Sequence, residues 1–463
     1  MLREKAKQFS ALLQLKPFDD STPEGRSKER YRRIVISSTT SLFTRSFTML
    51  ASLIIVPLTL NYLGSEQYAL WASLTSFVTW IALFDFGIIS GLVNALSEAN
   101  GKNDQAAASG YVSSAFFLLI GIVGIIAAIF IGIVPFVNWA SVFAVEGIIP
   151  SSLVTLCVIA AVAPVLLGMP FSIVRQIYAG YQKIYIGNAF YVIGVALMLI
   201  GIYLAVTFNA QMPVLLLIYG GATIVVSIIN MVYIVKVEMP WLRPRLRFFS
   251  ASSVRRLMRT SVPLFLFQLG ALLINSTQPI ILAHRTDLDT VTDYSIWMRL
   301  FTLTGTVMVL STSSFLPTFR ESYERGEHAW MRTSFKRMMY VRMSIALAGA
   351  MLVLIVGNEF LSIWLRQANI QFSTQIWIAT FILMVVSAWS TGFSELLTIM
   401  DKIWVQVVLV LINGTMVILL TYWLSPEFGV LGAIVAYGFM VVIIQSWLNP
   451  ILTRPILQAN RSQ

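Results

Sequence analysis

Charged residues are scarce in this sequence, and their scarcity excludes most soluble proteins. Of the 463 residues, 11% are charged and 57% are apolar, whereas an average soluble domain is about 25% charged. Cysteine is nearly absent: Cys157 stands alone, so neither an intrachain disulfide nor a cysteine metal cluster can form. The two histidines, His284 and His328, are too few for most zinc or haem sites.

Motifs of catalysis are missing as well. The sequence contains no Ser/His/Asp grouping, no metal-ligand spacing and no glycine-rich phosphate-binding loop. We therefore expect a protein that is not an enzyme and that uses no cofactor.

Long apolar runs, by contrast, fill most of the chain. Twelve runs can be counted, and each is close to the roughly 20 residues that a helix needs to cross the hydrocarbon core of a bilayer. The sequence therefore predicts an all-α integral membrane protein with twelve transmembrane helices. The predicted spans are 34–59, 68–93, 110–134, 151–174, 184–208, 212–235, 260–283, 294–318, 340–363, 374–399, 403–424 and 429–449.

Lysine and arginine are concentrated in every second connection between these runs, starting with the N-terminal tail. The intervening loops contain only Arg285 and Arg366. Because Lys and Arg collect on the cytoplasmic side of a membrane, both termini are predicted to be cytoplasmic. The net charge of +11 is thus a topology signal. No nucleic-acid partner is expected, because no stacking motif accompanies the charge, and anionic lipid headgroups of the bilayer are the expected partner of the tail and loops.

The longest loop between spans divides the chain into two halves of six helices. Val254, Leu257 and Met258 of this loop share a helical face, so the segment could lie flat on the membrane as an amphipathic helix or form a solvated linker. The predicted parts are a basic cytoplasmic tail (1–33), an N-terminal six-helix bundle (34–237), a cytoplasmic linker (238–259), a C-terminal six-helix bundle (260–449) and a cytoplasmic tail (450–463).

Polar residues form stripes on three of the predicted helices. Arg45 lies near the middle of the first helix, with Ser41 and Thr48 on the same face. A charge at the bilayer centre costs roughly 2.5–3.5 kcal/mol, so we expect Arg45 and Arg299 to project into a polar cavity between the halves. For the uncharged residues, helix–helix packing is the alternative. The other predicted cavity-lining residues, on the seventh and eighth helices, are Gln268, Asn275, Gln278, Thr302 and Thr306.

Acidic residues inside the spans are few, and each has two interpretations. Asp85 in the second helix and Glu395 in the tenth could each bind a driving H⁺ or Na⁺. Asp85 could instead neutralise Arg45, and Glu395 could reach cytoplasmic water. Arg299 could likewise extend to the outer interface instead of into a cavity.

Five short motifs lie between Arg33 and Tyr111. They are Val56–Gly64 (VPLTLNYLG), Tyr68–Trp71 (YALW), Asp85–Gly87 (DFG), Gly91–Asn94 (GLVN) and Ser97–Gly101 (SEANG). This stretch, roughly the first two helices, resembles the start of Wzx-type polysaccharide flippases, such as O-antigen flippases, of the multidrug/oligosaccharidyl-lipid/polysaccharide (MOP) superfamily. An ion-coupled multidrug antiporter of the same superfamily is the alternative, for which a cavity dominated by carboxylates would be expected.

The resemblance implies a fold, a reaction and a site. It implies two six-helix bundles around a central cavity, in a multi-pass protein of the inner (plasma) membrane. By alternating access, the protein would carry an oligosaccharide linked to undecaprenyl diphosphate from the cytoplasmic to the outer leaflet during surface polysaccharide biosynthesis. A polysaccharide polymerase and glycosyltransferases are the implied partners.

The resemblance also implies how the substrate would be held. The related lipid II flippases hold the diphosphate with cavity arginines on helices 1, 2 and 8. Arg45 and Arg299 match this pattern on helices 1 and 8, whereas helix 2 has Asp85 and no arginine.

Overall fold

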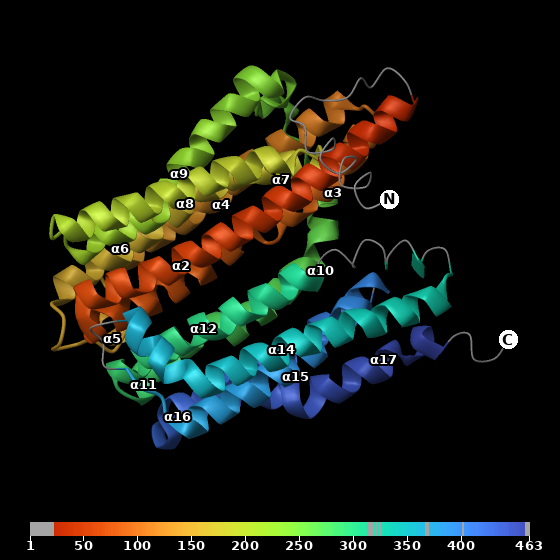
Figure 1. Ribbon diagram of the computed structural model, residues 1–463. Coiled ribbons are helices and arrows are strands. Elements are labelled where there is room, and N and C mark those ends of the chain that lie inside the picture. The colour runs from red at the N-terminus through yellow and green to blue at the C-terminus, as the bar shows by residue number, and fades with distance from the viewer. Residues whose placement is uncertain are drawn as a thin grey trace. The chain divides into compact units, whose positions relative to one another are not determined.

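In the computed structural model, all regular structure of the described residues is helical (Figure 1). The structure describes residues 23–312, 319, 322–323, 326–365, 370–400 and 402–458. The predicted basic tail up to residue 22 and the predicted C-terminal tail from residue 459 lie outside these residues. Nine helical segments within the described part are long and apolar enough to cross a membrane, in agreement with the predicted all-α class.

The described part of the chain contains fifteen α-helices, numbered as in Figure 1. They are α2 (Pro23–Ala82), α3 (Ile88–Gly101), α4 (Gln105–Ile133), α5 (Trp139–Val142), α6 (Ser151–Gly168), α7 (Ile173–Gly180), α8 (Ile184–Thr207), α9 (Met212–Tyr233), α10 (Ala251–Ser276), α11 (Gln278–Arg285), α12 (Leu288–Thr312), α14 (His328–Leu365), α15 (Thr374–Ile399), α16 (Ile403–Met440) and α17 (Ser446–Gln458).

Two of these helical segments, α2 and α16, each consist of two helices joined by a kink at a glycine. Gly64 in α2 has a φ of 74° and Gly429 in α16 has a φ of 53°. Side chains with a Cβ rarely adopt positive φ, so glycine suits both turns. The corresponding candidate membrane segments, Val35–Asp85 and Ile403–Arg454, are 51 and 52 residues long.

The second predicted span, 68–93, is interrupted in the structure. α2 ends at Ala82, a 3₁₀ turn follows at Leu83–Asp85, and α3 begins at Ile88. Between them Phe86 and Gly87 have φ angles of 50° and 73°, which a continuous right-handed helix does not allow. The eighth predicted span is shifted: α12 begins at Leu288 rather than at residue 294, and residues 313–318 lie outside the described part.

Contacts group the described chain into two compact units. The first unit contains residues within Met1–Leu53, Phe84–Val137 and Ile159–Val262, and the second contains residues within Ile54–Leu83, Asn138–Val158 and Pro263–Gln463. The division of the sequence into bundles 34–237 and 260–449 follows chain order and stays a prediction.

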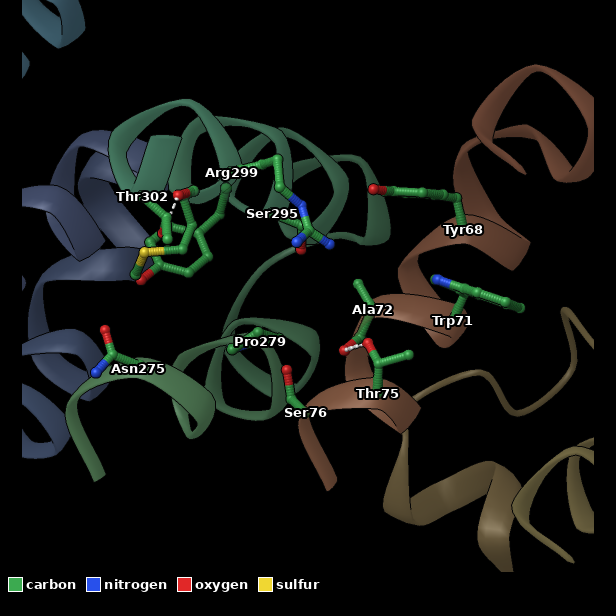
Figure 2. Close-up of a pocket in the computed structure, with 12 residues that line it drawn as sticks. Tyr68, Trp71, Ala72, Thr75, Ser76, Asn275, Pro279, Ser295, Arg299 and Thr302 are labelled. Carbon is green, nitrogen blue, oxygen red and sulfur yellow. Dashed lines mark hydrogen bonds between the residues drawn. The ribbon is translucent and has the colours of Figure 1, made fainter. Parts of the chain in front are cut away.

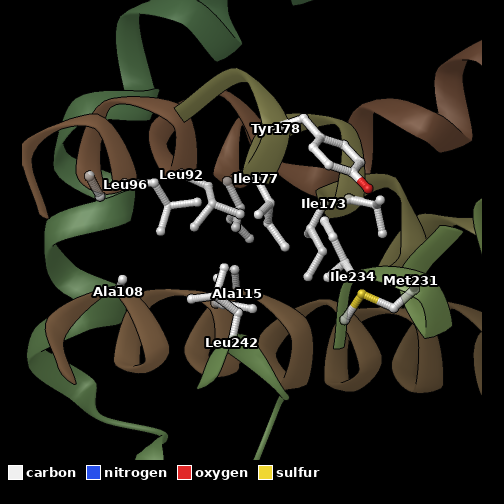
Figure 3. Packing of buried hydrophobic residues seen from close by; sticks show 14 of the residues in the cluster. Leu92, Leu96, Ala108, Ala115, Ile173, Ile177, Tyr178, Met231, Ile234 and Leu242 are labelled. Carbon is white, nitrogen blue, oxygen red and sulfur yellow. The ribbon is translucent and has the colours of Figure 1, made fainter. Parts of the chain in front are cut away.

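The core of the first unit is built on α3, α4 and α7 (Figure 3). Leu92 and Leu96 are fully buried one helical turn apart on α3, and they pack with Ile173 and Ile177 of α7. Gly180 permits this packing, because a Cβ at its position would lie 2.6 Å from the Cβ of Leu96. α8 packs against α7 and α9 within the same unit.

The predicted linker 238–259 docks on this core. Three serines of α4 form hydrogen bonds with its backbone. Ser109 Oγ donates to Trp241 O at 2.7 Å. Ser113 Oγ accepts from Arg245 N at 3.2 Å, and Ser114 Oγ accepts from Ser250 N at 3.1 Å. Residues 251–259 are the first turns of α10, and Leu257 is fully buried in the core. The Leu257 face predicted from the sequence thus packs on the core of the first unit, and the placement of this segment against the membrane stays a prediction.

The second unit is organised around α15. This helix packs against α12, α14, α16 and α17. Trp297 of α12 is fully buried and donates its indole N–H to Thr380 Oγ1 of α15 at 2.8 Å. Close approach of α10 to α16 depends on Gly270, where a Cβ would lie 2.6 Å from Val410 Cγ1. These contacts fix α12, the helix that carries Arg299.

The end of α3 is held by a small group of charges outside the predicted spans. The Glu98 carboxylate forms ion pairs with Lys102 at 2.7 Å and with Arg256. Hydrogen bonds and charge attraction from these two cations hold the pKa of Glu98 below its usual value. A carboxyl group with a lowered folded-state pKa stabilises the fold above its unfolded pKa, about 4.3, and loses that effect as the pH falls through the folded value.

We therefore expect Glu98→Gln to lower the melting temperature of the purified protein at pH 7 by about 1–2 °C, since both pairs are exposed. At an acidic pH below the folded-state pKa of Glu98 the two proteins should melt together, because the carboxylate is then protonated. Thermal melts in detergent at the two pH values measure this, and a difference that persists at low pH would contradict the assignment.

Candidate functional site

A polar pocket lies within the second unit, between residues of α2 and helices α10, α11 and α12 (Figure 2). Its volume is about 180 Å³, enough for several waters. It is smaller than the sites of about 300–1,000 Å³ that enclose drug-sized ligands, and it suits a group of the size of a phosphate. Its wall consists of Tyr68, Trp71, Ala72, Thr75, Ser76, Asn275, Pro279, Tyr294, Ser295, Met298, Arg299 and Thr302.

Helical periodicity explains why these residues share one wall. The α2 residues follow one another at steps of three and four, from Tyr68 through Trp71 and Thr75, so they form one stripe. The α12 residues from Tyr294 to Thr302 repeat the same spacing. Ser295 and Thr302 donate their hydroxyl hydrogens to carbonyl oxygens of their own helix, both at 2.7 Å, which leaves the oxygen lone pairs able to accept from a ligand.

Arg299 is the cation of this pocket. Its side chain is half-buried and extends from α12 toward the side of the pocket where Tyr68 and Trp71 lie (Figure 2). Within the part of the chain that the structure describes, Arg299 forms no hydrogen bond or ion pair, and the described wall has no acidic side chain. A guanidinium group offers five N–H donors in a planar fork, so the pocket is suited to an anion.

The pocket brings together three of the predicted site residues, namely Arg299, Asn275 and Thr302. Thr306 lies one turn further along α12 and donates to Thr302 O at 2.9 Å. Gln268 is exposed on α10, and it is not part of the described pocket wall.

Gln278 serves helix packing in the structure. It is fully buried, and its Nε2 donates to Thr421 Oγ1 at 3.2 Å, joining α11 to α16. This is the role that the packing alternative predicts for a polar side chain inside a helix bundle.

The predicted residues of the first helix lie in the first unit. Arg45 is exposed and forms no hydrogen bond or ion pair among the described residues. Ser41 Oγ accepts from Asn188 Nδ2 at 2.9 Å, and Thr48 donates to Thr44 O of its own helix at 2.8 Å. Thr48 thus bonds within its own helix, and its place in a cavity stays a prediction.

Asp85 lies in the turn between α2 and α3. Its side chain is 9% exposed, and Oδ1 accepts from the backbone N–H of Gly87 at 2.8 Å. Among the described side chains no ion pair joins Asp85 to Arg45, and the carboxylate accepts a local hydrogen bond from Gly87.

Glu395 has a partner that the sequence analysis did not identify. Its carboxylate lies 2.8 Å from Nη1 of Arg342, whose side chain is 2% exposed on α14. Arg342 Nη2 also donates to Thr391 Oγ1 at 3.0 Å. The pair therefore lies between α14 and α15 with the guanidinium buried and the carboxylate partly exposed, and Glu395 is not a carboxylate facing only water.

Sequence reasoning missed the contribution of α2 to the pocket. Tyr68, Trp71, Thr75 and Ser76 lie at helical spacing inside the predicted span 68–93, and the first two belong to the YALW motif. The stripe was hard to recognise because it mixes aromatic and small polar residues. The motif itself was the signal that could have located it.

We expect Glu395→Gln to destabilise the protein by about 3 kcal/mol, because it leaves a buried guanidinium without its counter-charge. The double variant Arg342→Met/Glu395→Leu should regain most of that loss, since well-packed apolar side chains can replace a buried ion pair. Unfolding of purified variants in detergent measures both. A double variant no more stable than Glu395→Gln would contradict the view that the pair acts as one structural unit.

The helical arrangement is that of MATE transporters. The chain is similar to a multidrug resistance MATE family transporter of the MOP superfamily in an inward-facing conformation, with a TM-score of 0.75 and 14% identity, covering 92% of this chain and 99% of that one. It is also similar to a MOP superfamily transporter from Pyrococcus furiosus, whose binding pocket is described as having reverse polarity, with a TM-score of 0.62 and 16% identity over 92% and 96% of the two chains. At these identities the likeness shows the fold alone.

The chain belongs to the polysaccharide biosynthesis protein family, whose model matches residues 35–322. It is also 40% identical over 73 residues to a Salmonella typhimurium protein named "Putative O-antigen transporter", and the matched stretch spans 16% of each chain. Fold and family together confirm two predictions from the sequence: a helical membrane protein with many candidate spans, and a member of a polysaccharide biosynthesis family.

Proposed function

We propose that this protein moves an oligosaccharide linked to undecaprenyl diphosphate from the cytoplasmic to the outer leaflet of the plasma membrane. The observation that carries the proposal is the guanidinium of Arg299, which stands in a polar pocket with no acidic residue in its described wall. Membership of the polysaccharide biosynthesis family supports the same substrate class.

The chemistry of the pocket fits an anionic sugar carrier. A diphosphate needs fixed positive charge, and the guanidinium fork matches the geometry of phosphate oxygens. The hydroxyls of Ser295 and Thr302 and the aromatic rings of Tyr68 and Trp71 suit sugar hydroxyls and sugar rings. The lipid tail can remain in the bilayer. A cationic drug, by contrast, would be repelled by Arg299, which weighs against the antiporter alternative.

The pocket is large enough for only part of the proposed substrate. A volume of about 180 Å³ suits a phosphate-sized group and is too small for an oligosaccharide. Alternating access would supply wider states on each side of the membrane during transport.

The proposal includes twelve crossings with both termini in the cytoplasm. The segments Val35–Asp85 and Ile403–Arg454 have 51 and 52 residues, so each is roughly 75 Å long at about 1.5 Å per residue and can cross a core of about 30 Å twice. The turns at Gly64 and Gly429 separate the two crossings of each. If each of these two long segments is counted as two crossings, the nine candidate segments give eleven crossings. The helix α12 adds the twelfth.

The proposal also assigns roles in substrate binding and ion coupling to charged residues outside the pocket. Arg45 is a second cation for the diphosphate, by its match to the pattern of the lipid II flippases. Asp85 remains the better candidate for coupling to H⁺ or Na⁺, because Glu395 is already paired with Arg342. A polysaccharide polymerase and glycosyltransferases are the proposed partners of the pathway.

Arg299→Ala is expected to reduce surface polysaccharide by about tenfold or more, since a bidentate charged contact of about 1.5–3 kcal/mol is lost. Arg299→Lys should retain part of the activity, because it keeps the charge but not the fork. The measurement is surface polysaccharide in cells that lack their own copy, at matched amounts of protein in the membrane.

Arg285→Ala is the matched control for this experiment. Arg285 is an exposed arginine of the same unit whose guanidinium lies 4.2 Å over the Tyr422 ring, and it is not part of the described pocket wall. Normal polysaccharide in Arg299→Ala would refute the site. Drug resistance in cells that express the wild type, with no effect on polysaccharide, would favour the antiporter.

A further inference from the structure

Asn188 of α8 joins two other helices of the first unit through its side-chain amide. It is fully buried. Its Oδ1 accepts from Nη2 of Arg175 on α7 at 3.2 Å, and its Nδ2 donates to Ser41 Oγ on α2 at 2.9 Å. A neutral amide can accept and donate at once without adding charge. Asn188 therefore holds the guanidinium of Arg175 beside the Ser41 face of α2, within roughly 8 Å of the Ser41 hydroxyl by the lengths of the two bonds.

Further contacts fix the position of Arg175. Its guanidinium lies 5.0 Å from the centre of the Tyr191 ring, a cation–π contact. Its aliphatic part passes close to Gly187, where a Cβ would lie 3.6 Å from Arg175 Cγ. A solvated surface arginine needs none of these supports, whereas a binding residue gains from being held in place.

Arg175 keeps most of its binding capacity free. The hydrogen bond to Asn188 uses one of its five N–H donors. In the described residues no carboxylate pairs with it, and its side chain is exposed. Positive charge without a counter-charge, presented by a fixed side chain, is the arrangement that binds an anion.

Arg45 stands on the same face of α2 as Ser41. It follows Ser41 by four residues, which is one helical turn and about 6 Å along the axis. Side chains of a helix lean toward its N-terminus, so Arg45 leans toward the Ser41 level, where Asn188 holds Arg175. The two arginines, on α2 and α7, thus belong to one face of the first unit, and neither has an acidic partner among the described residues.

We infer that Arg175 and Arg45 form a diphosphate-binding site on this face of the first unit, with Arg175 as the contact nearer the cytoplasm. The inference rests on the proposed function and adds a residue that the arginine pattern on helices 1, 2 and 8 does not contain. Arg175 lies on α7, which ends at Gly180, and it is the first residue of the predicted cytoplasmic connection between the spans 151–174 and 184–208, whereas Arg45 is deeper in its span. An arriving diphosphate therefore meets Arg175 first, and the two guanidinium forks can each take one phosphoryl group.

The test measures lipid binding to purified full-length protein in detergent, with undecaprenyl diphosphate, undecaprenol and inorganic pyrophosphate as probes. The wild type should prefer undecaprenyl diphosphate to undecaprenol. Arg175→Ala should weaken binding of the diphosphate lipid about tenfold or more and leave undecaprenol unchanged, while Arg175→Lys should lie between the two. Pyrophosphate should compete with the lipid in the wild type and bind more weakly than the lipid does.

Asn188→Asp separates binding from folding. The substitution is nearly isosteric, and the new carboxylate would pair with Arg175 and neutralise it. Binding of the diphosphate lipid should fall as in Arg175→Ala, while the melting temperature stays within a few degrees of the wild type. If Asn188 and Arg175 serve only to pack helices, this variant would bind the lipid normally. Arg243→Ala, an exposed arginine of the same unit outside this group, is the matched control and should bind normally.

The outcomes distinguish this inference from the function on which it rests. If Arg45→Ala and Arg299→Ala lose the preference for the diphosphate lipid and Arg175→Ala keeps it, the role of Arg175 is refuted and the proposed function stands. If the folded wild type binds undecaprenol as tightly as undecaprenyl diphosphate, both are refuted. Pyrophosphate that binds as tightly as the lipid would refute a lipid-linked ligand at this site.

Discussion

A guanidinium group inside a membrane protein loses hydration and needs other polar or charged groups around it. The arginines of this protein differ in whether the protein itself supplies those groups. Arg342 is buried and pairs with Glu395 at 2.8 Å, so its charge is neutralised within the protein. Arg299 stands at a polar pocket with no acidic residue in its described wall. A charge inside the bilayer is costly, and the proposed function assigns the compensation of Arg299 to an anionic ligand.

The rest of the structure supplies rigidity around these charges. Small residues let helices approach closely, as at Gly180 in the first unit and Gly270 in the second. Hydroxyl and amide side chains then join neighbouring helices, such as Trp297 to Thr380 and Asn188 to Ser41. Side chains on such supported helices hold their geometry, which a binding site for a small charged group requires.

The sequence predicted the features that depend on composition and helical period. Apolar run length predicted the helices, and a polar stripe placed Arg299 with Thr302 on one face of α12. Features that depend on contacts distant in sequence could not be read in the same way. The partner of Glu395 is 53 residues away, and the docking of the 238–259 segment depends on serines of α4. The break at Asp85 arises from local backbone angles that an apolar run conceals.

The central claim is that fixed positive charge binds the phosphorylated head of a sugar-carrying lipid. Transport in proteoliposomes tests it most directly, with two glycolipids that share tail and sugar and differ only in whether a diphosphate joins them. The account predicts rapid movement of the diphosphate form between leaflets and little or no movement of the neutral form. Equal transport of both would contradict it.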